Sequence, residues 1–568
     1  MTTSDTRNTT VLTQDGGTDT QWWREAVVYQ IYPRSFNDSD GDGIGDLPGI
    51  REKVEYLDSL GVDVVWLCPV YDSPNADNGY DISDYRSLMA EFGTMADWED
   101  LLEALHERDI RLIMDLVVNH TSKQHEWFQR SKHRTGEFEE YYHWVEGEPD
   151  EPPNNWESIF GGPAWTYDET RGEWYLHLFD PEQPDLNWRN PDVREAITET
   201  ATWWLEKGID GFRLDAIDPL SKTDGYPDGD PESPIVGIEH FSHGPRLDEY
   251  LEELVAAFEN YDAMTVGEMG GVDIEQVDDY TGENGLDMIF QFDHMDVGGG
   301  PNGRWDPDNF GDWTLADLKE TLSRQQAEID CPALFFGNHD QPRLVSHFGN
   351  DERFREESAT LVATCLLTLR GTPYVYQGEE IGMKNHEFDS LDAIDDPMTV
   401  GAVEDLIADG TVTSFEEARD LVNYWSRDHA RTPVQWDDSE NAGFSDHDPW
   451  LSVNDDFDAI NVARAQSSPD SVWTHYRDLI ELRHSEMSLV DGEYDLLLPD
   501  STQFYAYLRT FENETILVVL NWSDESACFE YPAGESTQAE LLLSNYDDTP
   551  ATPDGHEFRP YEAGVYKL

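Results

Sequence analysis

Three acidic residues stand at the ends of apolar segments of the chain: Asp215 in GFRLDAID, Glu268 in TVGEM and Asp340 in FFGNHDQPR. Placing a carboxylate at the end of a buried strand is costly unless the group is paired or used. Cleavage of a glycosidic bond uses two carboxyl groups, held about 5–5.5 Å apart when the mechanism retains configuration. A third acid can bind sugar hydroxyls. A salt bridge or a helix cap would explain each acid taken alone, so convergence of the three is an expectation.

Eight short apolar segments alternate with helix-like segments, and this alternation predicts βαβ units and a parallel sheet. Eight such units predict an α/β fold, a closed (β/α)₈ TIM barrel, in which chemistry sits at the carboxyl ends of the strands. His120, Asp215, Glu268 and Asp340 occur at such ends. The predicted strands lie in residues 27–36, 62–70, 111–120, 211–218, 264–269, 287–293, 332–340 and 372–380.

Other parts of the chain depart from this alternation of strands and helices. With 568 residues the chain exceeds a single core, which stops growing near ~250–300 residues. An aromatic, loop-rich stretch after the third predicted strand is typical of an inserted subdomain. After residue 490 the pattern changes to alternating and β-branched runs, which predict a C-terminal β-sandwich domain. The predicted units are a flexible polar tail (1–21), the barrel (22–121 and 191–490), the inserted subdomain (122–190) and the β domain (491–568).

The strand-end motifs resemble those of a known family. DLVVNH (115–120), GFRLDAID (211–218), VGEM (266–269) and FFGNHD (335–340) are similar to the four signature regions of the α-amylase family, glycoside hydrolase family 13. QPDLNW (183–188) resembles the fifth region as found in oligo-1,6-glucosidases and α-glucosidases. The resemblance extends from about Trp22 into the C-terminal domain.

The resemblance implies roles for individual residues. Asp215 would be the nucleophile, Glu268 the acid/base, and Asp340 the acid that stabilises the distorted sugar. Arg213 lies two residues before Asp215 on one strand face and should hold it ionised. Phe160 and Phe179 would be aromatic walls, although core packing explains them equally well. The substrate-binding set is Asp77, Tyr80, His120, Phe160, Phe179, Arg213, His339 and Arg431.

Arg431 and Asp77 matter most for the mode of action. In the subgroup that the chain resembles, this pair would close one end of the pocket. A closed pocket makes an enzyme exo-acting, so that it releases one glucose from a non-reducing end.

The loop Asp38-Ser-Asp40-Gly-Asp42-Gly-Ile44-Gly-Asp46 places oxygens at alternating positions between glycines, a pattern typical of a hard-cation site. The twelfth position is Gly49, so the bidentate Glu of an EF-hand is missing. The resemblance implies a structural Ca²⁺ or Mg²⁺ ion and no organic cofactor. An acidic turn in an acid-rich protein is the alternative. The expected ligands are Asp38, Asp40, Asp42, Asp46 and the carbonyl of Ile44.

Ala216, which follows the nucleophile, bears on linkage. Oligo-1,6-glucosidases tend to have valine there, so alanine favours maltose and malto-oligosaccharides, with sucrose or isomaltose as further substrates and transglucosylation as a side reaction. The alternatives within the enzyme class are a sucrose isomerase, a trehalose synthase or a dextran glucosidase. A non-catalytic relative, like the heavy chains of amino-acid transporters, is disfavoured because all three acids are present.

The charge is unusual. Lys and Arg total 36 and Asp and Glu total 120, a net charge of -84. Such repulsion weakens a compact state in dilute buffer and is screened at molar salt. This predicts a halophilic protein of a high-salt cytosol, against the alternative of an ordinary acidic protein. The charge also disfavours binding to nucleic acid or anionic membranes.

The remaining features are consistent with a cytoplasmic location. The N-terminus has no apolar core of a signal peptide, and no run of ~20 apolar residues would span a membrane. The cysteines are far apart and contain no CxxC pair, so reduced thiols are expected. The partner is expected to be a small oligosaccharide, and the chain a monomer or small homo-oligomer. The four cysteines are Cys68, Cys331, Cys365 and Cys528.

Overall fold

The computed structural model describes residues 21–282, 284–300, 303–532 and 539–568, and its centre is an eight-stranded parallel sheet. The strands are hydrogen-bonded in the order β11-β10-β9-β5-β2-β1-β13-β12, and β11 lies beside β12, which gives a barrel. Each of the eight predicted segments contains one strand, so the predicted barrel is confirmed. The strands are β1 (Val28–Ile31), β2 (Val64–Leu67), β5 (Arg111–Val117), β9 (Gly211–Asp215), β10 (Met264–Glu268), β11 (Met288–Phe290), β12 (Ala333–Leu334) and β13 (Thr372–Tyr376).

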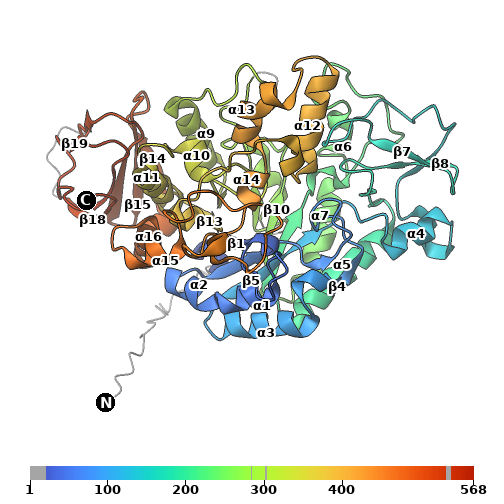
Figure 1. The fold of residues 1–568 in the computed structure, drawn as a ribbon, viewed down its shortest axis with the longest axis horizontal. Helices are drawn as coiled ribbons and strands as arrows, with labels where there is room; N and C mark the ends of the chain where they lie inside the picture. Colours follow the sequence, from blue (N-terminus) through green and yellow to red (C-terminus); the bar gives the residue numbers. More distant parts are fainter. Residues whose placement is uncertain (1–20, 283, 301–302, 533–538) are drawn as a thin grey trace.

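Helices surround the barrel (Figure 1). Their starts follow the sequence: Thr94 and Thr314 each form a capping box with an aspartate three residues later. The principal helices are α1 (Leu47–Glu52), α2 (Val54–Leu60), α3 (Met95–His106), α5 (Pro191–Lys207), α7 (Leu247–Ala256), α9 (Leu315–Glu328), α10 (Leu344–Phe348), α11 (Arg355–Thr368) and α16 (Val472–Ser485).

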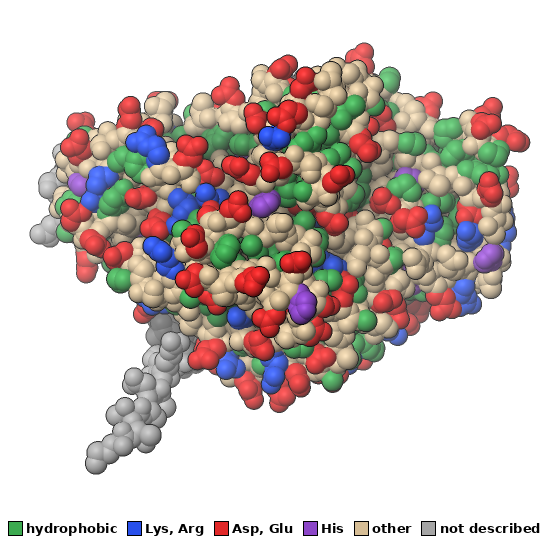
Figure 2. Space-filling model, viewed as in Figure 1, with side chains coloured by type: hydrophobic (Ala, Val, Ile, Leu, Met, Phe, Trp, Pro, Cys, Tyr) green, Lys and Arg blue, Asp and Glu red, His purple; other side chains and the backbone are tan. Residues whose placement is uncertain are grey.

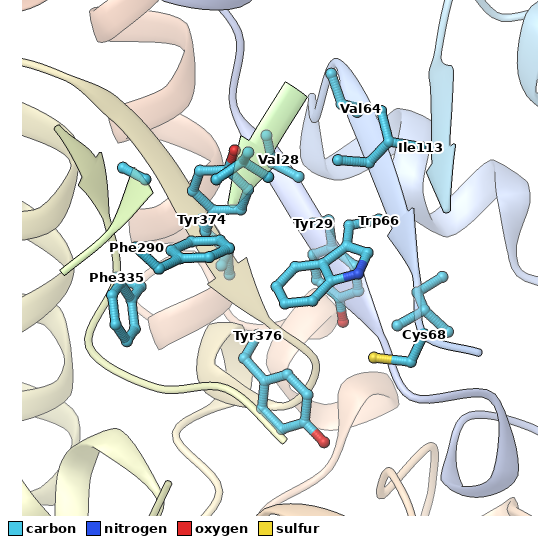
Figure 3. Packing of buried hydrophobic residues seen from close by; sticks show 14 of the residues in the cluster. Val28, Tyr29, Val64, Trp66, Cys68, Ile113, Phe290, Phe335, Tyr374 and Tyr376 are labelled. Atoms are coloured by element: carbon cyan, nitrogen blue, oxygen red, sulfur yellow. The ribbon is translucent and has the colours of Figure 1, made fainter. Parts of the chain in front are cut away.

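The barrel interior is filled with aromatic rings (Figure 3). The ring of Phe290 on β11 contacts those of Trp66, Tyr374 and Phe335, at centroid distances of 5.5, 4.7 and 5.2 Å. Each fully buried apolar side chain of this size contributes about 1.5–3 kcal/mol. The contacts join β11 to strands on both sides of the barrel and thereby fix the strand ends that carry the polar residues.

An inserted unit follows β5 and has a core of its own. It contains α4 (Glu126–Lys132) and an antiparallel sheet of β6 (Trp144–Glu146), β8 (Glu173–Leu176) and β7 (Trp165–Asp168). Trp156, Trp165 and Trp174 form the centre of this second core. The unit lies at the opposite end of the molecule from the C-terminal strands (Figure 1).

A helical hairpin, α12 (Pro397–Ala408) and α13 (Phe415–Trp425), was not separated from the barrel by the sequence pattern. It packs around Val403, Ala418 and Val422, apart from the barrel core. The segment after it, α14 (Asp428–Arg431), ends in Arg431 and has Arg427 as its N-cap, and both arginines are discussed below.

The C-terminal domain is a five-stranded antiparallel sheet in the order β14-β15-β16-β20-β18, with a two-stranded ribbon, β17-β19, against it. The second layer of the predicted sandwich is thus short. Arg509 of β15 donates hydrogen bonds to the carbonyls of Thr368 and Gly492, tying the domain to α11. The strands are β14 (Glu493–Leu497), β15 (Phe504–Phe511), β16 (Glu514–Asn521), β17 (Ala527–Cys528), β18 (Glu540–Ser544), β19 (Glu557–Phe558) and β20 (Ala563–Lys567).

Carboxylates are scattered widely over the face seen in Figure 2, with fewer basic groups among them. Within the described ranges, no helix has the length and apolar character needed to cross a membrane. The predicted N-terminal tail lies outside the described residues, apart from Gln21.

Candidate active site

The centre of the site is the guanidinium of Arg213, which joins three carboxylates. Nη1 donates to Asp215 at 2.5 Å and also to Asp115, and Nη2 lies 2.7 Å from Oε2 of Glu268. Two of the predicted acids therefore lie close enough to share one cation. Asp115 is a third member that the sequence pattern did not single out.

Strand register explains this convergence. Asp115 of β5 pairs with Arg213 of β9, and Val266 of β10 pairs with the same residue on the other side. Alternate residues of a strand point to one face, so Arg213 and Asp215 both reach the barrel interior. Gly267 lets β10 lie against the side chain of Ile217, because a Cβ at position 267 would be only 2.4 Å from that side chain.

The pKa values of two carboxyl groups around Arg213 are raised, which favours a proton held within the cluster. Burial raises the pKa of Asp215 well above its ordinary value; Arg213 opposes this, while Glu268 and Asp115 add to it. Burial likewise raises the pKa of Asp115 to about 6. We expected Arg213 to keep Asp215 ionised; its charge acts in that direction, but burial and two neighbouring carboxylates outweigh it. Three carboxylates around one cation favour retention of a proton within the group.

Ala216 continues from Asp215 in a left-handed conformation, with φ of 45°. Its backbone N–H donates to Oε2 of Glu268 at 3.2 Å. Left-handed backbone at a non-glycine residue costs about 1–2 kcal/mol, so this conformation is maintained by its surroundings. The small side chain limits that cost, and the turn orients Glu268 next to Asp215.

Asp340 lies across the pocket, held by two arginines. Its Oδ1 accepts hydrogen bonds from Arg431 at 2.7 Å and from Arg427 at 3.2 Å. Burial alone would raise the pKa of Asp340, but the neighbouring His339 and the charges of Arg427 and Arg431 outweigh it and hold that pKa below its usual range. Asp340 is therefore ionised at neutral pH.

His339 and Tyr80 form a stacked pair beside Asp340. The rings are 5.2 Å apart with an 8° interplanar angle, and the Tyr80 hydroxyl lies 2.7 Å from Nε2 of His339. Burial lowers the pKa of His339 to about 3, so the imidazole is neutral at physiological pH. The structure thus brings these two predicted residues together with the third acid.

Asp77, expected at one end of the pocket, is paired with a different arginine from the one that we expected. The nearest guanidinium is that of Arg427, at 3.7 Å, whereas Arg431 binds Asp340 and the carbonyl of His339. The two arginines lie one helical turn apart and face the same side. Arg431 is thus corrected to a ligand of Asp340, and Arg427 is the residue opposite Asp77. Asp396 anchors Arg427 from behind, 2.5 Å from its Nη2.

The aromatic residues predicted as walls are brought to the same place. Phe179 packs against His120 at 4.9 Å and against Phe160 at 5.5 Å, and the guanidinium of Arg427 lies 5.2 Å from the Phe160 ring. Both phenylalanines are half-buried. Gln183, which sequence reasoning missed, links His120 to Asp77 through its side-chain nitrogen, at 3.2 and 3.0 Å.

The predicted cation loop is partly assembled. Carboxylate oxygens of Asp38, Asp40 and Asp42 lie within 4.8 Å of one another. Asp46 lies outside this group because its oxygens accept hydrogen bonds from Ser39 and from the backbone N–H of Gly49, where it caps α1. A set of three carboxylates is the donor chemistry that Ca²⁺ or Mg²⁺ takes, so the loop fits a hard cation.

The site residues that sequence reasoning missed differ in how clearly the sequence marks them. Asp115 is a charge inside a strand that is buried on both faces, RLIMDLV, and such a charge must be paired. Its second oxygen accepts from the indole N–H of Trp66 at 2.7 Å. Arg427, Asp396 and Gln183 lie in loops and caps, where no periodic pattern marks them.

Comparisons with known proteins agree with this geometry. The model of the alpha-amylase catalytic domain matches residues 30–492, and that of the maltogenic amylase C-terminal domain matches residues 494–564. An oligo-1,6-glucosidase of Halalkalibacterium halodurans is 51% identical over 96% of this chain and 99% of that protein. An alpha-glucosidase of Pediococcus pentosaceus is 44% identical, with coverage of 96% and 99%.

Solved structures give the same picture. The trehalose-6-phosphate hydrolase of Bacillus licheniformis superposes with a TM-score of 0.90, at 43% identity, covering 96% of this chain and 99% of that one. A mutant trehalulose synthase superposes with a TM-score of 0.93, also at 43% identity, covering 96% and 100%. The fold and the carboxylate site define a glycoside hydrolase. The chain belongs to the alpha-amylase family.

Proposed function

We propose that the protein is a retaining, exo-acting α-glucosidase that releases glucose from the non-reducing end of short α-glucosides. The observation that carries this is the placement of Asp215 and Glu268 on one guanidinium. The contact of 3.7 Å between Asp77 and Arg427 supports a pocket that this pair closes at one end. A substrate can extend from such a pocket in one direction only.

The chain's own residues can perform both steps of a double displacement. Asp215 attacks the anomeric carbon while the bond to the glycosidic oxygen breaks, and that oxygen takes the proton of Glu268. Water then attacks the anomeric carbon, Glu268 removes its proton and Asp215 departs. Asp340, ionised between two arginines, binds sugar hydroxyls, and neutral His339 and His120 can donate or accept hydrogen bonds beside it.

The sequence alone favoured maltose as the substrate, but the similar proteins change the linkage that we propose. Four of the similar curated proteins that are 47–51% identical to the chain are oligo-1,6-glucosidases. We therefore place α-1,6-linked isomalto-oligosaccharides first. Cleavage of α-1,4 linkages is the second candidate, supported by Ala216, whose small side chain beside the nucleophile leaves room for a differently angled acceptor.

A sugar isomerase is the alternative within the same chemistry, since a trehalulose synthase is among the similar structures. The acceptor of the glucosyl group decides between the two reactions. Transfer to water is hydrolysis, and transfer back to the released sugar is isomerisation. The test is a product assay on isomaltose, maltose, sucrose and trehalose. Free glucose as the main product supports the proposal, and rearranged disaccharide as the main product would replace it.

We further propose a working environment of molar salt in the cytosol. The support is the net charge of -84 together with its spread over the visible face in Figure 2. We also propose a structural divalent cation in the loop of Asp38, Asp40 and Asp42, whose two positive charges would offset most of the negative charge of three clustered carboxylates. Experiments on both are described below.

A further inference from the structure

The imidazole of His339 is buried and packs against three aromatic rings. It stacks with the ring of Tyr32 at a centroid distance of 6.1 Å and with that of Tyr80 at 5.2 Å, with interplanar angles of 19° and 8°. The indole of Trp66 meets it edge-on at 6.1 Å. These contacts fix the plane of the imidazole. The freedom that remains is the choice of the ring nitrogen that carries the proton.

The surroundings of Nε2 of His339 call for a hydrogen-bond donor. Burial lowers the pKa of His339 to about 3, so the neutral ring has one N–H and one unprotonated nitrogen. Nε2 lies 3.4 Å from Oδ2 of Asp340, an ionised carboxylate that can only accept. It also lies 2.7 Å from the hydroxyl of Tyr80, which can accept. An unprotonated Nε2 would turn its lone pair towards the negative charge of Asp340, so the proton belongs on Nε2.

Gln30 supports the same arrangement from the other side of the ring. Its buried amide nitrogen lies 2.9 Å from Nδ1 of His339. An amide NH₂ group can only donate, so it matches a lone pair on Nδ1 and would oppose an N–H there. The same nitrogen lies 3.2 Å from Sγ of Cys68, a weak acceptor, so each of its two N–H groups has an acceptor. Both sides of the imidazole therefore favour one tautomer.

The barrel holds Gln30 in this place. Gln30 belongs to β1, where it pairs with Trp66 of β2 and with Tyr376 of β13. Paired residues of neighbouring strands point to the same side of a sheet, and Trp66 and Tyr376 are among the rings of the barrel interior in Figure 3. The carbonyl of Gln30 accepts a hydrogen bond from the N–H of Gln377 at 3.1 Å. The amide of Gln30 is thus positioned by strand register.

We propose that Gln30 is a positioning residue that keeps the proton of His339 on Nε2. His339 then presents an N–H, not a lone pair, beside Asp340, where the proposed function places a sugar hydroxyl. A hydroxyl that donates to the carboxylate of Asp340 still has lone pairs with which to accept from this N–H. The inference rests on the proposed α-glucosidase function, which leaves open whether His339 donates or accepts.

The kinetic test is a double-mutant cycle on the disaccharide that the native protein cleaves best. Gln30→Met keeps the length of the side chain but cannot donate, so kcat/KM should fall about fivefold to tenfold, the effect of one lost hydrogen bond. In a His339→Asn background the same substitution should change kcat/KM by less than about twofold, because no imidazole is left to orient. Gln326→Met is the matched control and should leave kcat/KM unchanged. Gln326 is a buried glutamine of α9 whose amide donates to the carbonyl of Arg370.

A second measurement reads the tautomer without catalysis. In protein that contains ¹⁵N-labelled histidine, NMR distinguishes a protonated from an unprotonated ring nitrogen, and His339→Asn assigns the signals. The native protein should carry the proton of His339 on Nε2. Gln30→Glu, whose carboxylate accepts, should place a proton on Nδ1.

Two results would overturn the role of Gln30. One is a proton on Nδ1 of His339 in the native protein. The other is an equal loss of kcat/KM from Gln30→Met with and without His339, which would show that Gln30 acts independently of the imidazole. Failure of the native protein to release glucose from every disaccharide would instead overturn the proposed function, and the NMR result would still report the tautomer.

Discussion

The guanidinium of Arg427 lies 3.7 Å from the carboxylate of Asp77 and shares Asp340 with Arg431. The proposed function puts this pair at the closed end of the pocket, and Asp396 holds Arg427 through an ion pair. Asp396 also caps α12 through the N–H groups of Met398 and Thr399. Asp396 therefore links Arg427 to the start of the α12–α13 hairpin.

Arg427→Ala should leave Asp77 buried without its cation. Truncation of one partner of a buried charge pair costs about 2–5 kcal/mol, so kcat/KM for a disaccharide should fall about 30- to 4000-fold. Arg419→Ala removes a half-buried arginine paired with Glu416 on the nearby α13 and is the control. A native-like kcat/KM in purified Arg427→Ala would show that the pocket end lies elsewhere.

Asp396→Ser separates two roles of one side chain. Serine is a good helix cap, so the cap of α12 is kept. Its hydroxyl is too short to hold Arg427, and loss of the buried carboxylate should lower the melting temperature. KM should rise while kcat stays nearly constant, if substrate binding is what the arginine supports. An unchanged KM in a folded Asp396→Ser protein would restrict Asp396 to capping.

The acid/base role of Glu268 can be tested by the leaving group. Proton donation contributes about 10²–10⁴-fold to a rate, so Glu268→Gln should lose that factor on isomaltose. A dinitrophenyl glucoside needs no protonation, and its first step should remain fast, with a burst of phenolate. Asp215→Asn should abolish both reactions. If Glu268→Gln lost both substrates equally, Glu268 would not be the proton donor.

Much of this site could be predicted from the sequence because barrel geometry fixes it. Strand periodicity placed Arg213 and Asp215 on one face, and register then brought Glu268 to them. The sequence did not show which of two arginines one turn apart reaches Asp77, because that depends on how α14 packs. The pKa of Asp215 is raised, whereas we expected Arg213 to lower it. Asp115 contributes to this rise, and only the folded barrel brings Asp115 near Asp215.

Activity should depend on pH through Asp77, in addition to the carboxyl groups around Arg213 whose pKa values are also raised. Burial raises the pKa of Asp77 to about 6. Asp77 acts towards Arg427 in its ionised form, so kcat/KM should fall as the pH drops through 6. Asp77→Asn should remove this contribution and make the fall of kcat/KM less steep, and an unchanged pH profile would show that Asp77 is not one of the titrating groups.

Removal of the proposed cation should affect stability before chemistry. An ion present at 100 times its dissociation constant stabilises the folded state by about 2.7 kcal/mol. EDTA, at constant ionic strength, should therefore lower the melting temperature of the native protein, and added Ca²⁺ or Mg²⁺ should restore it. Asp42→Asn should abolish this response, and Asp58→Asn, on α2, should retain it. A melting temperature insensitive to EDTA in the native protein would leave the loop as an acidic turn.

The folded state should require salt, because the repulsion that comes with a net charge of -84 is reduced only when salt screens it. The Debye length falls from about 10 Å at 0.1 M to about 3 Å at 1 M. Circular dichroism and glucose release should both be lost at 0.1 M KCl and recover towards 4 M. Sucrose would be a competing substrate, so trimethylamine N-oxide at equal osmolality is the better uncharged control. It stabilises folded proteins by exclusion from their surfaces but screens no charge. Recovery in KCl but not in the osmolyte would assign the effect to charge, whereas native structure and activity at 0.1 M KCl would refute a salt requirement.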